Sequence, residues 1–177
     1  MDPRNTGRAR GGERSLLSMV RHNGLVDISA RTEYALRAML QLATAPSGDA
    51  VSVDALASAQ DLPRRFLEAI FSDLKSGGLV RSVRGPHGGY VLTRKPAQIP
   101  LGDVMRAVSG PLAEVRGLRP HETKYNGVAT HLPEVWVAVR VALRDVLDAT
   151  TLDDVLRGDL PAHVKAMADR PEAWQNR

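Results

Sequence analysis

The 177-residue sequence contains no cysteine, which excludes disulfide bonds, thiolate redox sensing and iron–sulfur clusters held by thiolates. It also has no run close to the ~20 apolar residues that a transmembrane helix needs. The early apolar run at 16–20 is too short for the core of a signal peptide. We therefore expect a cytoplasmic protein that does not interact with a membrane.

Recognisable catalytic motifs are missing as well. The sequence has no glycine-rich phosphate loop, no HExxH motif and no nucleophile turn of a Ser-His-Asp enzyme. Adjacent carboxylates such as Asp153 and Asp154 stand at the start of an expected helix, where they favour the helix dipole and do not form an acid–base pair. We therefore predict that the protein is not an enzyme.

The composition nevertheless supports a folded domain. Hydrophobic residues make up 43% of the chain, which is enough for a core. This length favours one small domain with an extension or a helical appendage. The formal net charge is only +4, but the charges are distributed unevenly, so their placement is more informative than their total.

The stretch 62–94 combines a helix pattern with a hairpin pattern. Apolar residues recur at helical spacing between Phe66 and Leu74, and a Gly-Gly pair then ends the helix. Two short β-type runs follow at 79–84 and 90–94, joined by the sequence GPHGG. A helix, a tight stop and a glycine-rich hairpin in this order are typical of the second half of a winged helix-turn-helix.

The preceding residues supply the other helices of this motif. An apolar face that starts near Ser29 and stops before Pro46 predicts a first helix. Ser52 is predicted to cap a short second helix, and Pro63 fits the first position of the third, where its missing N–H costs nothing. These features predict a winged helix-turn-helix domain over 27–100, whose third helix usually enters the major groove of DNA.

Positive charge gathers on the third helix and the hairpin. Seven basic and two acidic side chains between residues 62 and 95 give this stretch a net charge of +5. A basic helix beside a basic hairpin is a suitable electrostatic footprint for a DNA backbone. Residues 1–26 are also basic, with a net charge of +3, and lack sustained periodicity. We predict a disordered extension there; a basic arm that reaches DNA is the alternative.

Residues beyond 100 are predicted to form an appendage. A short helix at 101–109 and a loop without periodicity make up segment 101–131. A long helix then opens at Pro133 and runs to about Asp148, followed by a capping box for a short helix ending at Gly158. We place these two helices in segment 132–160, and predict that residues 161–177 form a frayed tail.

The long helix carries a wide apolar stripe. Its heptad-like members are Leu132, Trp136, Val139, Leu143 and Val146, and Val135, Ala142 and Ala149 widen it. Because the winged domain already has a core, a stripe this wide calls for a partner surface. We predict self-association as a homodimer through this helix; folding back onto the chain's own winged domain is the alternative.

Three segments of the sequence carry a family resemblance. They are ISARTEYALRAMLQLA at 28–43, LPRRFLEAIFSDLKSGGLVRSVRGPHGGYVLTR at 62–94, and PLGDVMRAVSGPL at 100–112. Together with the long helix and TTLDDVL, they resemble the Rrf-two family of bacterial winged-helix regulators over residues 27–158. The resemblance implies a homodimeric transcription factor with the long helix as its dimer element. Each recognition helix would enter a major groove while each wing lies along a minor groove.

Candidate DNA-binding residues come from the third helix and the wing. The resemblance places Glu68 where some relatives read bases, and a carboxylate can accept a hydrogen bond from cytosine N4. Alternatively, Glu68 only supports the helix through neighbours such as Arg64. The hairpin glycines allow positive φ and a close approach to DNA, and His87 replaces a glycine common in the family. The candidate set is Arg64, Arg65, Glu68, Lys75, Arg84, Gly85, His87, Gly88 and Gly89.

The loop before the long helix is where sensing members of the family keep three cysteines, and this chain has none. We therefore expect no cluster and predict no cofactor. Imidazole and carboxylate groups can bind zinc or iron, but the spacing of the loop's candidates matches no compact motif. These candidates are Glu114, His121, Glu122 and His131.

The same region offers two aromatic residues. Tyr125 and Trp136 could line a pocket for a small ligand, although the position of Trp136 on the stripe favours dimer packing. An unidentified small-molecule or protein effector is therefore left open.

The sequence as a whole predicts a mainly α protein with a small β-hairpin, in which a winged helix-turn-helix domain precedes a long C-terminal dimerisation helix. We predict a sequence-specific transcriptional regulator, a repressor that binds double-stranded DNA at an inverted-repeat promoter site as a homodimer. The alternative is a winged-helix interaction module whose basic face binds an acidic partner protein.

Overall fold

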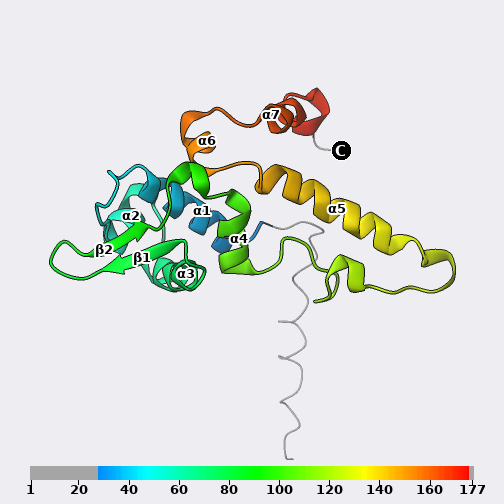
Figure 1. Cartoon of the computed structure of the whole chain (residues 1–177), viewed down its shortest axis with the longest axis horizontal. Coiled ribbons are helices and arrows are strands. Elements are labelled where there is room, and N and C mark those ends of the chain that lie inside the picture. Colours follow the sequence, from blue (N-terminus) through cyan, green and yellow to red (C-terminus); the bar gives the residue numbers. More distant parts are fainter. Residues whose placement is uncertain (1–27, 176–177) are drawn as a thin grey trace, which may run out of the picture.

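The computed structural model describes residues 28–175, so the predicted extension at 1–26 lies outside the described residues. The described chain is mainly helical with one antiparallel two-stranded hairpin (Figure 1). The helices are α1 (Ala30–Ala43), α2 (Val53–Gln60), α3 (Arg64–Ser76), α4 (Leu101–Ser109), α5 (Leu132–Leu147), α6 (Leu152–Arg157) and α7 (Ala162–Ala168). The strands are β1 (Val80–Val83) and β2 (Gly89–Leu92), and the 3-10 turns are η1 (Pro96–Gln98), η2 (Pro120–Glu122), η3 (Gly127–Ala129) and η4 (Pro171–Trp174).

Local caps set the boundaries of the first three helices. The Ser29 and Ser52 side chains each accept a hydrogen bond from a backbone N–H in the first turn of the helix that follows. Asp61 ends α2 in the left-handed conformation, with φ of 49°, and so turns the chain towards α3. Pro63 is the N-cap of α3 and not its first helical residue as predicted, because α3 begins at Arg64.

One hydrophobic core joins the three helices of the winged domain to α4 and α6. Val104 and Val108 of α4 and Leu152 of α6 are buried in it, so the core does not end at the predicted domain boundary at residue 100. The backbone explains this continuity, because the chain returns to the start of α4 after leaving α5. The N–H of Leu101 donates to the carbonyl of Thr150 at 2.8 Å, and the N–H of Leu152 donates to that of Ile99 at 3.0 Å.

The hairpin is held to the helices at its base. Val51, just before α2, and Tyr90 in β2 exchange two backbone hydrogen bonds of 3.0 and 2.9 Å. The Tyr90 ring also lies 4.6 Å from the ring of Phe71 in α3, measured between centroids. A Cβ at Gly89 would overlap the backbone of Val51, so this close approach requires a glycine. The position of the wing is therefore fixed relative to α3.

The region after α4 is built differently. Figure 1 shows α5 extending away from the core as a long rod, and none of its sixteen residues is buried. The predicted capping box is confirmed, since Thr151 and Asp154 bond each other's backbone N–H groups, and Gly158 is the C-cap that follows the last residue of α6. The predicted frayed tail is wrong for the described residues, because α7 and η4 form there and the Trp174 indole N–H donates to the carbonyl of Ala168 at 2.6 Å.

None of the helices between residues 28 and 175 is both long enough and apolar enough to cross a membrane.

Candidate nucleic-acid interface

The side of α3 that faces away from the core carries most of the predicted recognition residues. Arg64, Arg65 and Glu68 are all exposed, whereas Leu67 and Ile70 on the other side are buried. The hydrophobic residues of α3 thus anchor the helix and leave its polar side accessible. This is the geometry that a helix needs to enter a groove of DNA.

Two carboxylates surround Arg64. Its Nε lies 2.5 Å from Oδ1 of Asp54 in α2, and its Nη2 lies 3.4 Å from Oε1 of Glu68 one turn further along α3. The Arg64 guanidinium therefore joins the two helices of the helix-turn-helix. The ion pair between Glu68 and Arg64 matches the supporting role, in which Glu68 stabilises the helix. The Glu68 side chain is still 57% exposed, so the base-reading role is equally consistent with this geometry.

Phe66 is a residue that sequence periodicity assigned to the wrong side. It was grouped with the apolar face of the third helix, but it is 46% exposed. The guanidinium carbon of the neighbouring Arg65 lies 5.0 Å from the centre of the Phe66 ring, a cation–π distance. An exposed aromatic ring with a stacked arginine at the start of α3 adds Phe66 to the candidate surface.

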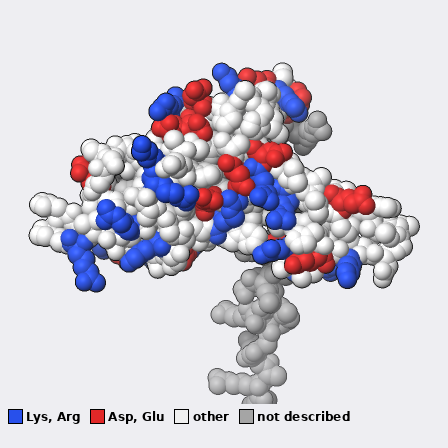
Figure 2. Space-filling view, viewed as in Figure 1, with Lys and Arg blue, Asp and Glu red and all other residues white. Residues whose placement is uncertain are grey.

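The wing supplies two further arginines beside α3. Arg81 and Arg84 are exposed along and after β1, and His87 is exposed at the tip. Figure 2 shows Lys and Arg side chains on the hairpin and α3 side of the molecule, with a further group near its middle. The wing arginines and Arg65 thus place positive charge on both the wing and α3, whereas the charge of Arg64 is balanced by Asp54 and Glu68.

The geometry of the hairpin explains why two of its positions are glycines, and it places Ser82 within reach of Lys75. Gly85 has a φ of 120°, and a Cβ at Gly88 would lie 2.5 Å from the carbonyl oxygen of Val83, so both positions require glycine. Lys75, near the end of α3, donates from Nζ to Oγ of Ser82 in β1 at 3.1 Å. In this structure, Lys75 therefore connects the recognition helix to the wing.

Helix α5 places the predicted dimerisation residues on two sides. Leu132, Trp136, Leu143 and Val146 are half-buried, and the Trp136 indole N–H donates to the Tyr125 hydroxyl at 3.3 Å. Tyr125 and Trp136 therefore contact each other, and neither lines the cavity described below. The exposed apolar side chains of α5 include Val135 at 51% and Val139 at 38%. Val137 and Val141, on another side of α5, are exposed as well, so the accessible apolar side chains are confined neither to the predicted stripe nor to the residues expected to widen it.

Three of the four loop residues considered as metal ligands have other partners, and the fourth, Glu114, is exposed. His121 accepts a hydrogen bond at Nδ1 from the Arg140 guanidinium at 3.4 Å, and Glu122 accepts one from the backbone N–H of Arg119 at 2.9 Å. His131 faces a glutamate of α5. Within residues 28–175, no group of three or more His, Asp or Glu residues is arranged to hold a metal ion.

Comparisons with known proteins give a consistent result. The family described as "Rrf2: Iron-dependent Transcriptional regulator" matches residues 28–158. The chain is 49% identical over 149 residues to "Putative HTH-type transcriptional regulator Rv1287" of Mycobacterium tuberculosis, covering 84% of this chain and 92% of that protein. It is 36% identical over 128 residues to the HTH-type transcriptional regulator CymR of Bacillus subtilis, covering 72% of this chain and 88% of CymR.

Two solved structures of similar proteins match the fold of this chain. The structure of CymR, the global cysteine regulator of B. subtilis, matches with a TM-score of 0.63 and 34% identity, covering 75% of this chain and 97% of CymR. The structure of T. potens IscR matches with a TM-score of 0.60 and 31% identity, covering 85% of this chain and 93% of IscR.

The iron in the family description does not fit the residues present here. The chain has no cysteine, and its loop histidines and carboxylates do not converge within the described residues. The fold and the named relatives are those of regulators and not of enzymes. This chain therefore belongs to the Rrf2 family of transcriptional regulators, and its winged helix is a DNA-binding domain.

Proposed function

We propose that this protein is a homodimeric repressor that occupies an inverted-repeat promoter site and blocks access of RNA polymerase. The observation that carries the proposal is the combination of one exposed basic surface on α3 and the wing with exposed apolar residues on α5. A cytoplasmic location is part of the proposal, because the DNA that it would bind lies there.

The apolar side of α5 supports the homodimer. Val135, Val139 and Ala142 are exposed on one side of a helix that has no buried residue, and apolar side chains at helical spacing are stabilised by a matching surface. A second copy of the same helix supplies such a surface with twofold symmetry. Two recognition helices related by a twofold axis then require a pseudo-palindromic DNA site.

The distribution of charge supports a duplex over an acidic protein as partner. Positive side chains stand on both α3 and the wing, on two elements whose relative position is fixed by the Tyr90 and Lys75 contacts. A duplex presents phosphates on both sides of a groove, so it engages both elements together. An acidic protein surface requires no such pairing of helix and wing.

A salt titration of duplex binding tests the proposal. An operator is first selected from random duplexes with the full chain, and its affinity is then measured by fluorescence anisotropy at increasing salt. We expect a steep, linear loss of log affinity with log salt, and Arg84→Ala should flatten this slope by about one unit because one phosphate contact is lost. Arg116→Ala, which removes an exposed arginine from the loop after α4, is the matched control and should leave the slope unchanged.

Glu68→Ala tests base reading in the same selection. We expect the selected sequence to become less defined at one position per half-site, with overall affinity changed little. An unchanged sequence preference would leave Glu68 with the supporting role alone. Failure of any duplex to compete with heparin or with an acidic protein would contradict DNA binding as the function of this surface.

A further inference from the structure

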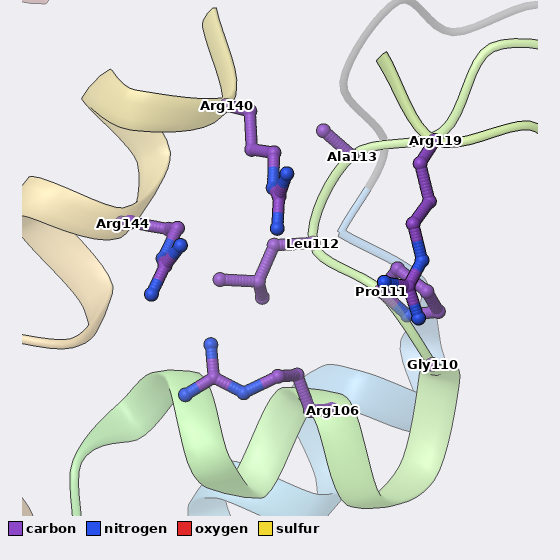
Figure 3. Close-up of a pocket in the computed structure, with 8 residues that line it drawn as sticks. All are labelled: Arg106, Gly110, Pro111, Leu112, Ala113, Arg119, Arg140 and Arg144. Atoms are coloured by element: carbon purple, nitrogen blue, oxygen red, sulfur yellow. The ribbon is translucent and has the colours of Figure 1, made fainter. Parts of the chain in front are cut away.

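The junction between α4, the loop after it and α5 contains a cavity lined by four arginines. Its volume is about 400 Å³, a size typical of small-molecule sites. The lining residues are Arg106, Gly110, Pro111, Leu112, Ala113, Arg119, Arg140 and Arg144. Figure 3 shows Arg106 from α4 and Arg140 and Arg144 from α5 pointing towards one another around Leu112, with Arg119 beside Pro111.

Two of the four arginines are already neutralised. Arg106 places Nη1 2.8 Å from Oδ1 of Asp148 and Nη2 2.9 Å from Oδ1 of Asp103. Arg144 places Nε 3.2 Å from the other oxygen of Asp148. Partial burial of Arg106 by itself lowers its pKa, but the hydrogen bonds and charges of Asp103 and Asp148 outweigh burial and raise the pKa. The Arg106–Asp148 pair holds α4 to the end of α5, whereas the Arg144–Asp148 pair lies within α5 and its C-cap.

The other two arginines have no such partner. Within residues 28–175, neither Arg119 nor Arg140 forms an ion pair with a carboxylate, and Arg140 only donates to the imidazole of His121. Among the residues that the structure describes, no acidic side chain lines the cavity. Arg140 points towards Arg106 and Arg144, and Arg119 lies beside Pro111 on the other side of Leu112 (Figure 3), so the two arginines add positive charge at separate points of the lining, and an anion bound in the cavity would compensate it.

The chemistry of the lining indicates the class of ligand. Planar guanidinium groups bind carboxylate and phosphate groups through paired hydrogen bonds. Pro111, Leu112 and Ala113 add a short apolar wall, which suits a few carbon atoms. We propose that this cavity binds a small organic anion carrying at least two carboxylate or phosphate groups, held chiefly by Arg119 and Arg140.

The position of the cavity gives such an anion a route to DNA binding. One wall is α4, whose Val104 and Val108 are part of the core beneath the recognition helix, and the opposite wall is α5. An anion that draws Arg140 towards Arg106 and Arg119 changes how α5 lies against the winged domain. In a dimer joined through α5, the same change alters the distance between the two recognition helices. This regulatory role rests on the proposed function, whereas the anion site itself does not.

Calorimetric titration of the full chain tests the site. The probes are citrate, as a tricarboxylate, and pyrophosphate, as a phosphate anion, each against sodium chloride at equal ionic strength. The test variant is Arg119→Gln with Arg140→Gln, which leaves the ion pairs of Arg106 and Arg144 intact. The control is Arg116→Gln with Lys124→Gln, which removes two positive charges from the same loop without touching the cavity lining.

We expect saturable binding of at least one probe to the wild-type chain, with the preferred probe separating carboxylate from phosphate ligands. The test variant should weaken binding by on the order of tenfold or more, because two charge-assisted contacts are lost, and the control should match the wild type. Absence of saturable binding of either probe, or equal weakening in both variants, would overturn the site.

Duplex binding by the same variants separates the site from the proposed function. Without added anion, the test variant and the control should bind the selected operator equally; a loss confined to the test variant would show that these arginines contact DNA, and would overturn the ligand site. A saturating probe should change the operator affinity of the wild type but not that of the test variant.

Anion binding without such a change in operator affinity would overturn the regulatory role alone. Absence of operator binding by the wild type would contradict the proposed function, while calorimetry would still report on the anion site.

Discussion

The winged domain and helix α5 are stabilised in different ways. Helices α1, α3 and α4 bury a continuous set of apolar side chains, and even the short α6 contributes the fully buried Leu152. Helix α5 is longer than any of them, yet it buries none of its residues. A helix in water gains most of its stability from packing, and α5 packs against its own chain only through half-buried side chains such as Trp136, which bonds Tyr125. The winged domain is therefore stabilised by its own buried core, whereas α5 leaves apolar side chains exposed to solvent.

The largest effect is expected where the core extends past residue 100. Leu152→Ala should destabilise the fold by about 3 kcal/mol, because a fully buried leucine leaves a cavity. Leu156→Ala in the same helix is the matched control, and should cost less than about 1 kcal/mol since Leu156 is 41% exposed. Urea unfolding measures both free energies of unfolding. Equal destabilisation by the two changes would show that α6 is not part of the core.

The next effect concerns the surface of α5. Val135→Glu combined with Val139→Glu should raise the dissociation constant of the homodimer by on the order of a hundredfold, because charged side chains replace exposed apolar ones at the proposed interface. Unfolding of the winged domain should change little. Val141→Glu, on another side of α5 and 50% exposed, is the control and should leave the dimer intact. Light scattering across a dilution series distinguishes these outcomes.

The smallest effect concerns the capping box at the start of α6. Hydrogen bonds from the Thr151 side chain and backbone lower the pKa of Asp154 below its ordinary value of 3.8. A lowered folded-state pKa stabilises the fold above that ordinary value, and the stabilisation is lost as the pH falls through the folded-state pKa. Asp154→Asn should therefore be less stable than wild type at neutral pH, and the difference should shrink on acidification. A difference that stays constant down to strongly acidic pH would exclude this role.

Local sequence signals predicted most of the winged domain. Short-range chemistry fixes these elements: Ser52 caps α2, the Gly-Gly pair ends α3, and Thr151 with Asp154 starts α6. The helix expected at 101–109 is α4, with those bounds. Each of these signals acts within a few residues, which is why the sequence alone reveals it.

Features that depend on distant contacts were not predictable in the same way. The membership of Leu152 in the core requires the chain to return to α4 after α5, and no local pattern shows this. Phe66 lies at the edge of an apolar stripe, where periodicity does not decide between burial and exposure. The arginine cavity joins Arg106, Arg119 and Arg140 from three separate elements, so only the folded chain brings them together.

The stoichiometry of the complex with the selected operator, measured by sedimentation velocity or light scattering, tests the proposed homodimer most directly. We expect two chains on one duplex that carries two half-sites, and a much weaker complex with a duplex that carries one. The Val135→Glu and Val139→Glu double variant should lose this preference for the paired site. A single chain that binds one half-site as tightly as the full operator would contradict a homodimer that presents two joined recognition surfaces.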